Sequence, residues 1–226
     1  HKSDVALSPI IIEEKWVHEL SGASSQRAGI SIYENGKKTV TKIGRMVFTH
    51  FGLSGPIVLN TSVLVREAMR YNDKVEISLD LVPELKLEAL DLKLQELFKD
   101  NQNKKLKNII RILAEGMLAE TILKLANIDG EKEVNVVKRE ERLVIGKILK
   151  DMRMTPVGFQ DLKTSIVASG GVAPEEVDFR TMQSRLFPNL YLTGDIIDIE
   201  RPSGGYSLQI CWTTGHVAGT DAAKIP

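Results

Sequence analysis

The sequence predicts an α+β fold made of a small antiparallel sheet or half-open barrel, a helical subdomain, and a closing strand, turn and helix. Alternating apolar and polar residues flank Asn35-Gly36, a dipeptide typical of tight hairpins because both central residues of that turn take positive φ. Leucines recur at helical spacing after Pro83. Near the end of the chain, Gly204-Gly205 precedes a helical pattern of small and apolar residues.

The composition is that of an ordinary globular protein. Of the 226 residues, 42% are hydrophobic, which is enough to build a core. The 30 basic residues balance 30 acidic ones, so no net field attracts nucleic acid or an anionic membrane, and we expect neither partner. The single cysteine, Cys211, excludes an intramolecular disulfide and fits a reducing compartment. Its place in a helical pattern indicates a small core residue.

Signals for membrane insertion or export do not occur in these 226 residues. No apolar run approaches the roughly 18 to 20 residues needed to span a bilayer, and no charged-then-apolar leader opens the sequence. We therefore expect a cytoplasmic protein. The sequence begins with His1 instead of Met, which suggests a portion of a longer protein.

The first part of the chain predicts the sheet. Residues 5–14 fit one or two short strands, and further strands are expected at residues 28–33, 38–43, 44–49 and 74–81. A helical pattern lies between the last two. Ser54 is a good N-cap for this helix, and Pro56 suits its first turn. We expect the helix to pack on the sheet.

The middle of the chain predicts a helical subdomain. Amphipathic helices are expected at residues 84–98, 106–113, 117–125 and 140–152. Strand character returns at residues 154–160 and 164–169, and a short strand at 175–179 precedes an irregular link at 181–188. We place the main boundary near Asp161. The first domain is residues 1–160, with its β part at about 5–81 and 152–160 and its helical part at about 83–151; the second is residues 161–226.

Residues 190–224 predict a ligand-facing helix start. A strand at residues 190–193 ends at Gly194-Asp195, and a helix follows Ser203-Gly204-Gly205 from residue 206 to 223. A helix that begins at paired glycines presents free backbone N–H groups and positive dipole charge, which suit a phosphate or an electron-rich ring edge. Asp195 could accept hydrogen bonds from sugar or polyol hydroxyls. From these residues alone, a strand end and helix cap without a ligand is an equally good interpretation.

These motifs carry a resemblance. Gly194-Asp195-Ile196-Ile197-Asp198 and Gly204-Gly205-Tyr206-Ser207-Leu208-Gln209 resemble the C-terminal segment of the BaiN/YhiN-like flavoproteins, also called aminoacetone oxidase-like FAD-binding enzymes. Residues 48–56 (FTHFGLSGP) and 169–172 (SGGV), leading into 181–184 (TMQS), match the same family in the same order. The resemblance implies an FAD-dependent oxidoreductase in which residues 1–160 form an inserted domain and 161–226 close a Rossmann-like FAD domain.

The resemblance also implies FAD contacts. Gly194-Asp195 would hold the ribityl hydroxyls and pyrophosphate side, and the backbone at Gly204, Gly205, Tyr206, Ser207 and Leu208 would face the pyrimidine edge of the flavin. The chain would pass close to the cofactor at Gly170 and Gly171. Ser207 stands where the family usually has Asn, which leaves open any contact that needs the reach of the amide.

The dinucleotide fingerprint of that family is absent from the sequence. No G-x-G-x-x-G occurs in the 226 residues, so we expect the N-terminal half of the FAD domain to be missing. We expect this chain alone to bind FAD weakly or not at all and to be inactive. The expected partners are that missing half and a small organic substrate, with NAD(P)H or oxygen as the second redox partner.

No catalytic acid or base stands out. His50, inside the 48–56 motif, is a weak candidate, and a structural hydrogen bond is at least as good an account of it. Four scattered histidines and one cysteine do not indicate a metal site. Asp198, Glu200 and Arg201 fit a solvated loop by default, with cavity lining as the alternative.

Two other classes of function remain. The helical subdomain, residues 84–152, could bind another protein, which a large exposed apolar patch would favour. A serine hydrolase using Ser54 with His216 and Asp195 is the remote alternative. The nucleophile-elbow pattern requires glycine two residues after the serine, and the chain has Pro56 there.

Overall fold

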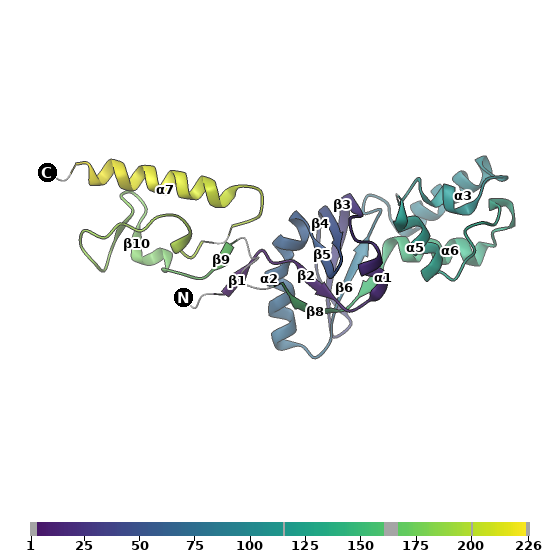
Figure 1. The fold of residues 1–226 in the computed structure, drawn as a ribbon, viewed down its shortest axis with the longest axis horizontal. Coiled ribbons are helices and arrows are strands. Elements are labelled where there is room, and N and C mark those ends of the chain that lie inside the picture. The colour runs from purple at the N-terminus through teal and green to yellow at the C-terminus, as the bar shows by residue number, and fades with distance from the viewer. Residues whose placement is uncertain (1–3, 115, 161–166, 200, 225–226) are drawn as a thin grey trace. The chain divides into compact units, whose positions relative to one another are not determined.

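The computed structural model describes residues 4–114, 116–160, 167–199 and 201–224 (Figure 1). Its contacts divide the chain into two units. The barrel unit comprises Pro9–Val58 and Leu64–Phe159, and the C-terminal unit comprises His1–Ser8, Leu59–Val63 and Gln160–Pro226. The boundary expected at Asp161 lies outside the described residues, and the proposed domain division stays a prediction. Within the described ranges, every helix is too short or too polar to span a bilayer.

An antiparallel sheet forms the centre of the barrel unit. The described residues contribute seven strands in the order β7-β6-β3-β4-β5-β2-β8. In chain order these are β2 (Ile10–Ile12), β3 (Ser24–Glu34), β4 (Lys37–Thr49), β5 (Gly52–Ser54), β6 (Val75–Asp80), β7 (Met152–Met154) and β8 (Pro156–Phe159). Only Thr155 separates β7 from β8, so the two edges of the sheet meet there and the sheet curls into a barrel. The Glu14 carboxylate accepts hydrogen bonds from the Thr155 N–H at 2.9 and 3.0 Å, which fixes the junction.

The hairpin between β3 and β4 confirms the prediction at Asn35-Gly36. Both residues have positive φ, 50° and 82°, as a two-residue turn of this type requires. The return arm differs from the prediction. Residues 38–43 and 44–49 form one continuous strand, because Gly44 stays in the ladder opposite Ala28. A Cβ on Gly44 would lie 3.2 Å from Ile57 Cβ, so the glycine gives room to a neighbouring side chain and does not end the strand.

A helix, α2 (Pro56–Tyr71), follows β5 directly. Pro56 occupies its first turn as predicted, but Ser54 is not its N-cap. Gly55 is the N-cap, with φ 96° and no side-chain hydrogen bond, while Ser54 is the last residue of β5 and pairs with Val47. The serine is used in the strand ladder and is therefore one residue too early to cap the helix. Strand β5 and the short helix α1 (Lys15–Glu19) were not predicted.

Four helices follow β6, close to the expected positions. They are α3 (Leu87–Asp100), α4 (Leu106–Ile110), α5 (Met117–Leu125) and α6 (Arg139–Lys150), which group together at one end of the barrel (Figure 1). Helix α3 starts three residues later than expected because Lys86 is extended as its N-cap. Helix α4 ends three residues early, and turns continue to Ala114.

The barrel and its helices share one apolar core. Ala28, Ile30 and Ile32 of β3 belong to it and are at most 1% exposed. Leu90 and Leu94 of α3 belong to the same buried cluster. The helices therefore complete the core of the barrel unit and do not form a separate core.

The C-terminal unit has little regular sheet among its described residues. Strand β1 (Asp4–Ala6) pairs antiparallel with β9 (Val167–Ser169), and β10 (Val177–Asp178) pairs with β11 (Gln183–Ser184). Two single turns, η3 (Pro174–Glu176) and η4 (Gly194–Ile196), and the long helix α7 (Tyr206–Ala222) complete it. A small core contains Val177, Met182, Leu192, Ile197 and Ala218.

Several predictions for this unit need correction. Residues 190–193 do not form a strand: only Tyr191 makes an isolated bridge, to Gln183, because the neighbouring strand β11 is only two residues long and does not extend the ladder. The strand expected at residues 175–179 is the turn η3 followed by two strand residues, and the link at 181–188 contains β11. Of the strand expected at 164–169, residues 164–166 lie outside the described residues and 167–169 form β9.

We predict that Gly52→Ala strongly destabilises the barrel unit. Gly52 has φ 154°, and a Cβ there would lie 2.2 Å from the carbonyl oxygen of Ile10 on the paired strand β2. Two backbones would have to separate, so we expect a loss of about 3 kcal/mol or more in the free energy of unfolding, measured with denaturant.

Gly22→Ala is the matched control. Gly22 also has positive φ, 90°, but no heavy atom lies within 4 Å of its ideal Cβ. This variant carries backbone strain alone and should lose only about 1–2 kcal/mol. Equal losses in the two variants would contradict the steric account.

Candidate functional site

Two of the segments predicted to lie near a flavin come together in the C-terminal unit. The Val172 N–H donates to the carbonyl oxygen of Ile196 at 2.8 Å, and the Asp198 N–H donates to that of Val172 at 2.9 Å. Val172 and Ile197 thereby form a parallel bridge. The glycine pair at 170–171 and the segment around Gly194 are thus joined by backbone hydrogen bonds.

Gly171 permits this crossing. It has φ 136°, and a Cβ on it would lie 2.2 Å from the carbonyl oxygen of Ile196. Gly170 also has positive φ, 88°. The structure therefore gives Gly171 a packing role that needs no ligand, and closeness of this backbone to a cofactor stays a prediction.

Gly194 lies against helix α7. Its ideal Cβ would be 2.9 Å from the sulfur of Cys211, and its N–H donates to Thr214 Oγ1 at 2.9 Å. Thr214 in turn donates to the carbonyl oxygen of Ile210 at 2.6 Å. Cys211 was predicted to be a small core residue, but it is half-buried and does not belong to the buried core; its sulfur lies against Gly194.

Asp195 lies beside the first turn of α7. Its Oδ1 accepts hydrogen bonds from Arg201 Nη1 at 2.6 Å and from Ser207 Oγ at 3.0 Å. The Arg201 side chain is 2% exposed and the Asp195 side chain is 47% exposed. The buried guanidinium therefore holds a carboxylate that is itself in contact with solvent. Among the hydrogen bonds of the described residues none ends on Oδ2, which leaves this oxygen able to accept from a ligand hydroxyl.

Arg201 corrects one expectation and adds a residue that the sequence did not reveal. It is buried, not part of a solvated loop, and it orients Asp195. Asp198 is half-buried, and Glu200 lies outside the described residues. Nothing in the spacing of Asp195 and Arg201 signals their pairing. Ser207, in the place of the usual Asn, supplies a hydroxyl that reaches Asp195 directly.

The start of α7 is free of side-chain caps. Gly204 and Gly205 have φ 111° and 92°, and Gly205 is the N-cap without a side-chain hydrogen bond. Both glycines are exposed, and so are Tyr206 and Leu208. The helix start that was predicted is confirmed, and it presents backbone N–H groups and positive dipole charge beside the Asp195 carboxylate.

The residues of the other predicted sites do not assemble within one unit. Ser54 belongs to the barrel unit, whereas His216 and Asp195 belong to the C-terminal unit, so neither unit contains the three groups of the hydrolase hypothesis. His50 is exposed and stands edge-on to the Phe51 ring, with centroids 4.9 Å apart. Its catalytic role stays a prediction. Across the described residues, no cluster of His, Cys, Asp or Glu could hold a metal ion.

The comparisons with known proteins assign this barrel with attached helices to a flavoprotein oxidoreductase-like class of protein. The chain belongs to the HI0933-like family: the model of the HI0933-like protein barrel and H2TH domain matches residues 5–167. The helices α3 to α6 lie within the matched part.

Three curated relatives support this class. The chain is 33% identical over 183 residues to a ribosomal RNA dihydrouridine synthase of Escherichia coli, covering 79% of this chain and 43% of the relative. It is 26% identical over 187 residues to a 3-dehydro-bile acid delta(4,6)-reductase of Clostridium scindens, covering 81% of this chain and 45% of the relative. It is 27% identical over 181 residues to a ribosomal RNA dihydrouridine synthase of Haemophilus influenzae, covering 80% of this chain and 42% of the relative. The chain spans less than half the length of these relatives.

We predict that Gly171→Ala disrupts the C-terminal unit. The added methyl group would press on the Ile196 carbonyl and break the bridge that holds the Gly194–Ile196 turn, so we expect a loss of about 3 kcal/mol or more, visible as a lower melting temperature. Gly205→Ala is the control, because Gly205 has positive φ but open space at its Cβ. A larger effect at Gly205 would contradict the packing role of Gly171.

Proposed function

We propose that this chain is part of a flavin-dependent reductase that saturates a carbon–carbon double bond conjugated to a carbonyl group. The names of two kinds of relative converge on this chemistry. Dihydrouridine is uridine with two hydrogens added across the ring double bond next to a carbonyl, and a delta(4,6)-reductase of a 3-dehydro bile acid acts on double bonds in line with a ketone. The reaction adds a hydride and a proton, and NAD(P)H is the proposed source of the electrons.

The observation that carries the proposal is the 33% identity to the Escherichia coli enzyme over most of this chain. It favours a uracil base of ribosomal RNA as the substrate. The balanced composition led us to expect no nucleic-acid partner, and that expectation is untested; the names of two relatives argue against it. A small organic substrate with a conjugated ketone is the second candidate, because the Clostridium scindens relative is named for one.

The residues of the C-terminal unit fit FAD, which would supply hydride transfer when bound. The open Oδ2 of Asp195 suits a ribityl hydroxyl, and the uncapped amides of Gly205 to Leu208 suit the electron-rich edge of the ring system. Arg201 holds Asp195 in place by a charge-assisted hydrogen bond next to the helix start. These roles remain part of the proposal, as do a cytoplasmic location and a missing N-terminal half.

Protein binding through the helical part stays a separate prediction. Exposed apolar side chains occur there, among them Leu92, Ile112 and Val136. They come from three different segments, and nothing in the structure assigns them a partner.

We predict that the intact protein, expressed from its complete reading frame, restores dihydrouridine to ribosomal RNA in Escherichia coli lacking the relative described above. Mass spectrometry of nucleosides from digested ribosomal RNA measures the product. Asp195→Ala should lower the yield at least tenfold, because a hydrogen bond to a charged group contributes about 1.5–3 kcal/mol. Glu175→Ala, a change of an exposed acid in η3, is the control.

The same preparation separates the two substrate classes. Reduction of a steroid with a conjugated ketone by the purified protein and NAD(P)H, without any dihydrouridine in the RNA, would favour the small-molecule candidate. If neither dihydrouridine nor a reduced steroid is formed, the proposed function is wrong.

We predict that the 226-residue chain alone binds FAD at least about a hundredfold more weakly than the intact protein. Two lost charge-assisted contacts to the pyrophosphate, at about 1.5–3 kcal/mol each, account for this factor. Quenching of flavin fluorescence during a titration measures the affinity. Equal affinities would show that the chain needs no further segment to form the FAD site.

A further inference from the structure

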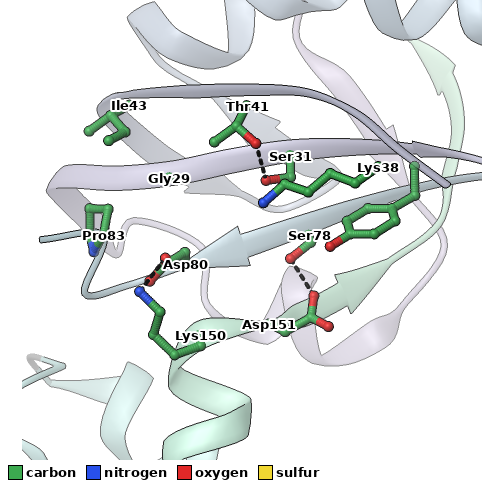
Figure 2. Close-up of a pocket in the computed structure, with 11 residues that line it drawn as sticks. Gly29, Ser31, Lys38, Thr41, Ile43, Ser78, Asp80, Pro83, Lys150 and Asp151 are labelled. Atoms are coloured by element: carbon green, nitrogen blue, oxygen red, sulfur yellow. Dashed lines mark hydrogen bonds and ion pairs between the residues drawn. The ribbon is translucent and has the colours of Figure 1, made fainter. Parts of the chain in front are cut away.

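The barrel unit contains a polar hollow of about 210 Å³ (Figure 2). It opens over strands β3, β4 and β6, beside the points where the helices leave and rejoin the sheet. Its walls include Gly29, Ser31, Thr41, Ile43, Ser78 and Asp80. It lies entirely within the barrel unit and shares no residue with the flavin-facing segment.

The register of three strands produces the polar wall. Ser31 of β3 pairs with Thr41 of β4 on one side and with Ser78 of β6 on the other, so three hydroxyl side chains form a row across the sheet. Because side chains alternate along a strand, Ile30 and Ile32 point into the core while Ser31 points into the hollow. The hydroxyl row of Ser31, Thr41 and Ser78 lines the hollow and is not needed to form the apolar core of the barrel.

The acidic groups of the hollow are already neutralised. Asp80 is paired with Lys150 at 2.6 Å, as Figure 2 shows. Asp151 accepts hydrogen bonds from Arg153 at 2.5 Å and from Ser78. Burial acts to raise the pKa of Asp151, but these two hydrogen bonds and the positive charges of Arg153 and Lys38 together hold the pKa below its usual value. Each carboxylate therefore has a cationic partner, Lys150 for Asp80 and Arg153 for Asp151.

One cation and one hydroxyl proton remain available. Lys38 lines the hollow and extends along Ser31 and Thr41 in Figure 2. Its positive charge acts on the Asp151 carboxylate, but within the described part of the chain its ammonium group forms no ion pair. Ser31 and Thr41 share one hydrogen bond of 2.9 Å, which uses only one of their two protons. An ammonium group and a hydroxyl donor on one wall suit a phosphate oxygen.

The size and the remaining lining narrow the ligand class. At about 210 Å³ the hollow is smaller than the roughly 300–1,000 Å³ of sites for drug-sized molecules, so it suits a sugar-phosphate and not a steroid or a flavin ring. The hydroxyl row offers partners for ribose hydroxyls. The Tyr33 ring also lines the hollow, and the Arg153 guanidinium is stacked on it, 3.5 Å from the ring centre.

We propose that this hollow binds the ribose-phosphate portion of a nucleotide, with Lys38 and the Ser31–Thr41 hydroxyl pair on the phosphate. Two sources share this chemistry: a strand of RNA and a nicotinamide dinucleotide. The inference goes beyond the proposed function because it assigns a binding site and holds whichever bond the enzyme reduces. The hollow would also provide a local binding site for RNA on a chain that has no net charge.

Binding by the intact protein tests the proposal without turnover. Anisotropy of a fluorescein-labelled single-stranded RNA and the fluorescence of NADPH give the two affinities. We expect Lys38→Ala to weaken one of them about fivefold, the upper range for an exposed charge contact. Thr41→Val, which removes the hydroxyl and keeps the shape, should weaken the same one. For RNA, Lys38→Ala should also reduce the slope of log affinity against log salt by about 0.7.

Lys42→Ala is the matched control. Lys42 is also an exposed lysine of β4, but its neighbours Thr41 and Ile43 face the hollow. Because side chains alternate along a strand, Lys42 points to the other side of the sheet. A loss confined to RNA identifies an RNA strand, and a loss confined to NADPH identifies the dinucleotide. Equal losses for Lys38 and Lys42, no loss for Lys38, or no binding by the unchanged protein would overturn the proposal. Because no product is measured, absence of dihydrouridine would count against the proposed reaction alone.

Discussion

The barrel unit depends on the double pairing of strand β3. This strand is hydrogen-bonded to β4 on one side and to β6 on the other, and the two ladders fix its register over most of its length. A shift by one residue would exchange its two faces. Ala28, Ile30 and Ile32 would leave the core, and Ser31 and Tyr33 would leave the polar hollow. The same constraint therefore sets both the stability of the barrel and the chemistry of its outer face.

Backbone contacts set the geometry of the C-terminal unit in a similar way. This unit has a small core, so its structure depends strongly on a few close contacts between backbone segments. Gly171 lets the chain cross the Ile196 carbonyl, and Gly194 lets the turn rest on Cys211 and Thr214 of α7. These two contacts place Asp195 beside the first turn of the helix. The glycines of the motif act first as packing residues, and their position is what makes a ligand site there possible.

The sequence predicts what depends on neighbouring residues and fails where a partner is distant in the chain. The turn at Asn35-Gly36 and the bounds of α5 follow from local turn chemistry and periodicity. Ser54 was assigned to a cap because its pairing with Val47 is a property of the sheet. The anchoring of Asp195 by Arg201 and the hydroxyl row of the hollow need the folded register. The prediction that residues 194–208 face a flavin came from family resemblance, and neither periodicity nor composition indicated the hollow.

A reductase that acts on a base within RNA has two separate tasks, since it must hold a long charged chain and reduce one small ring. Binding energy from parts of the substrate remote from the reacting bond can be used to position that bond. The relatives are named for an RNA and for a bile acid, two substrates that share a conjugated carbonyl and little else. The reducing chemistry can therefore be common to the family while the holding surface differs. In this chain the hydroxyl row, Lys38 and the neutralised acids form a surface for ribose and phosphate, whereas an apolar steroid would leave the same polar groups without partners.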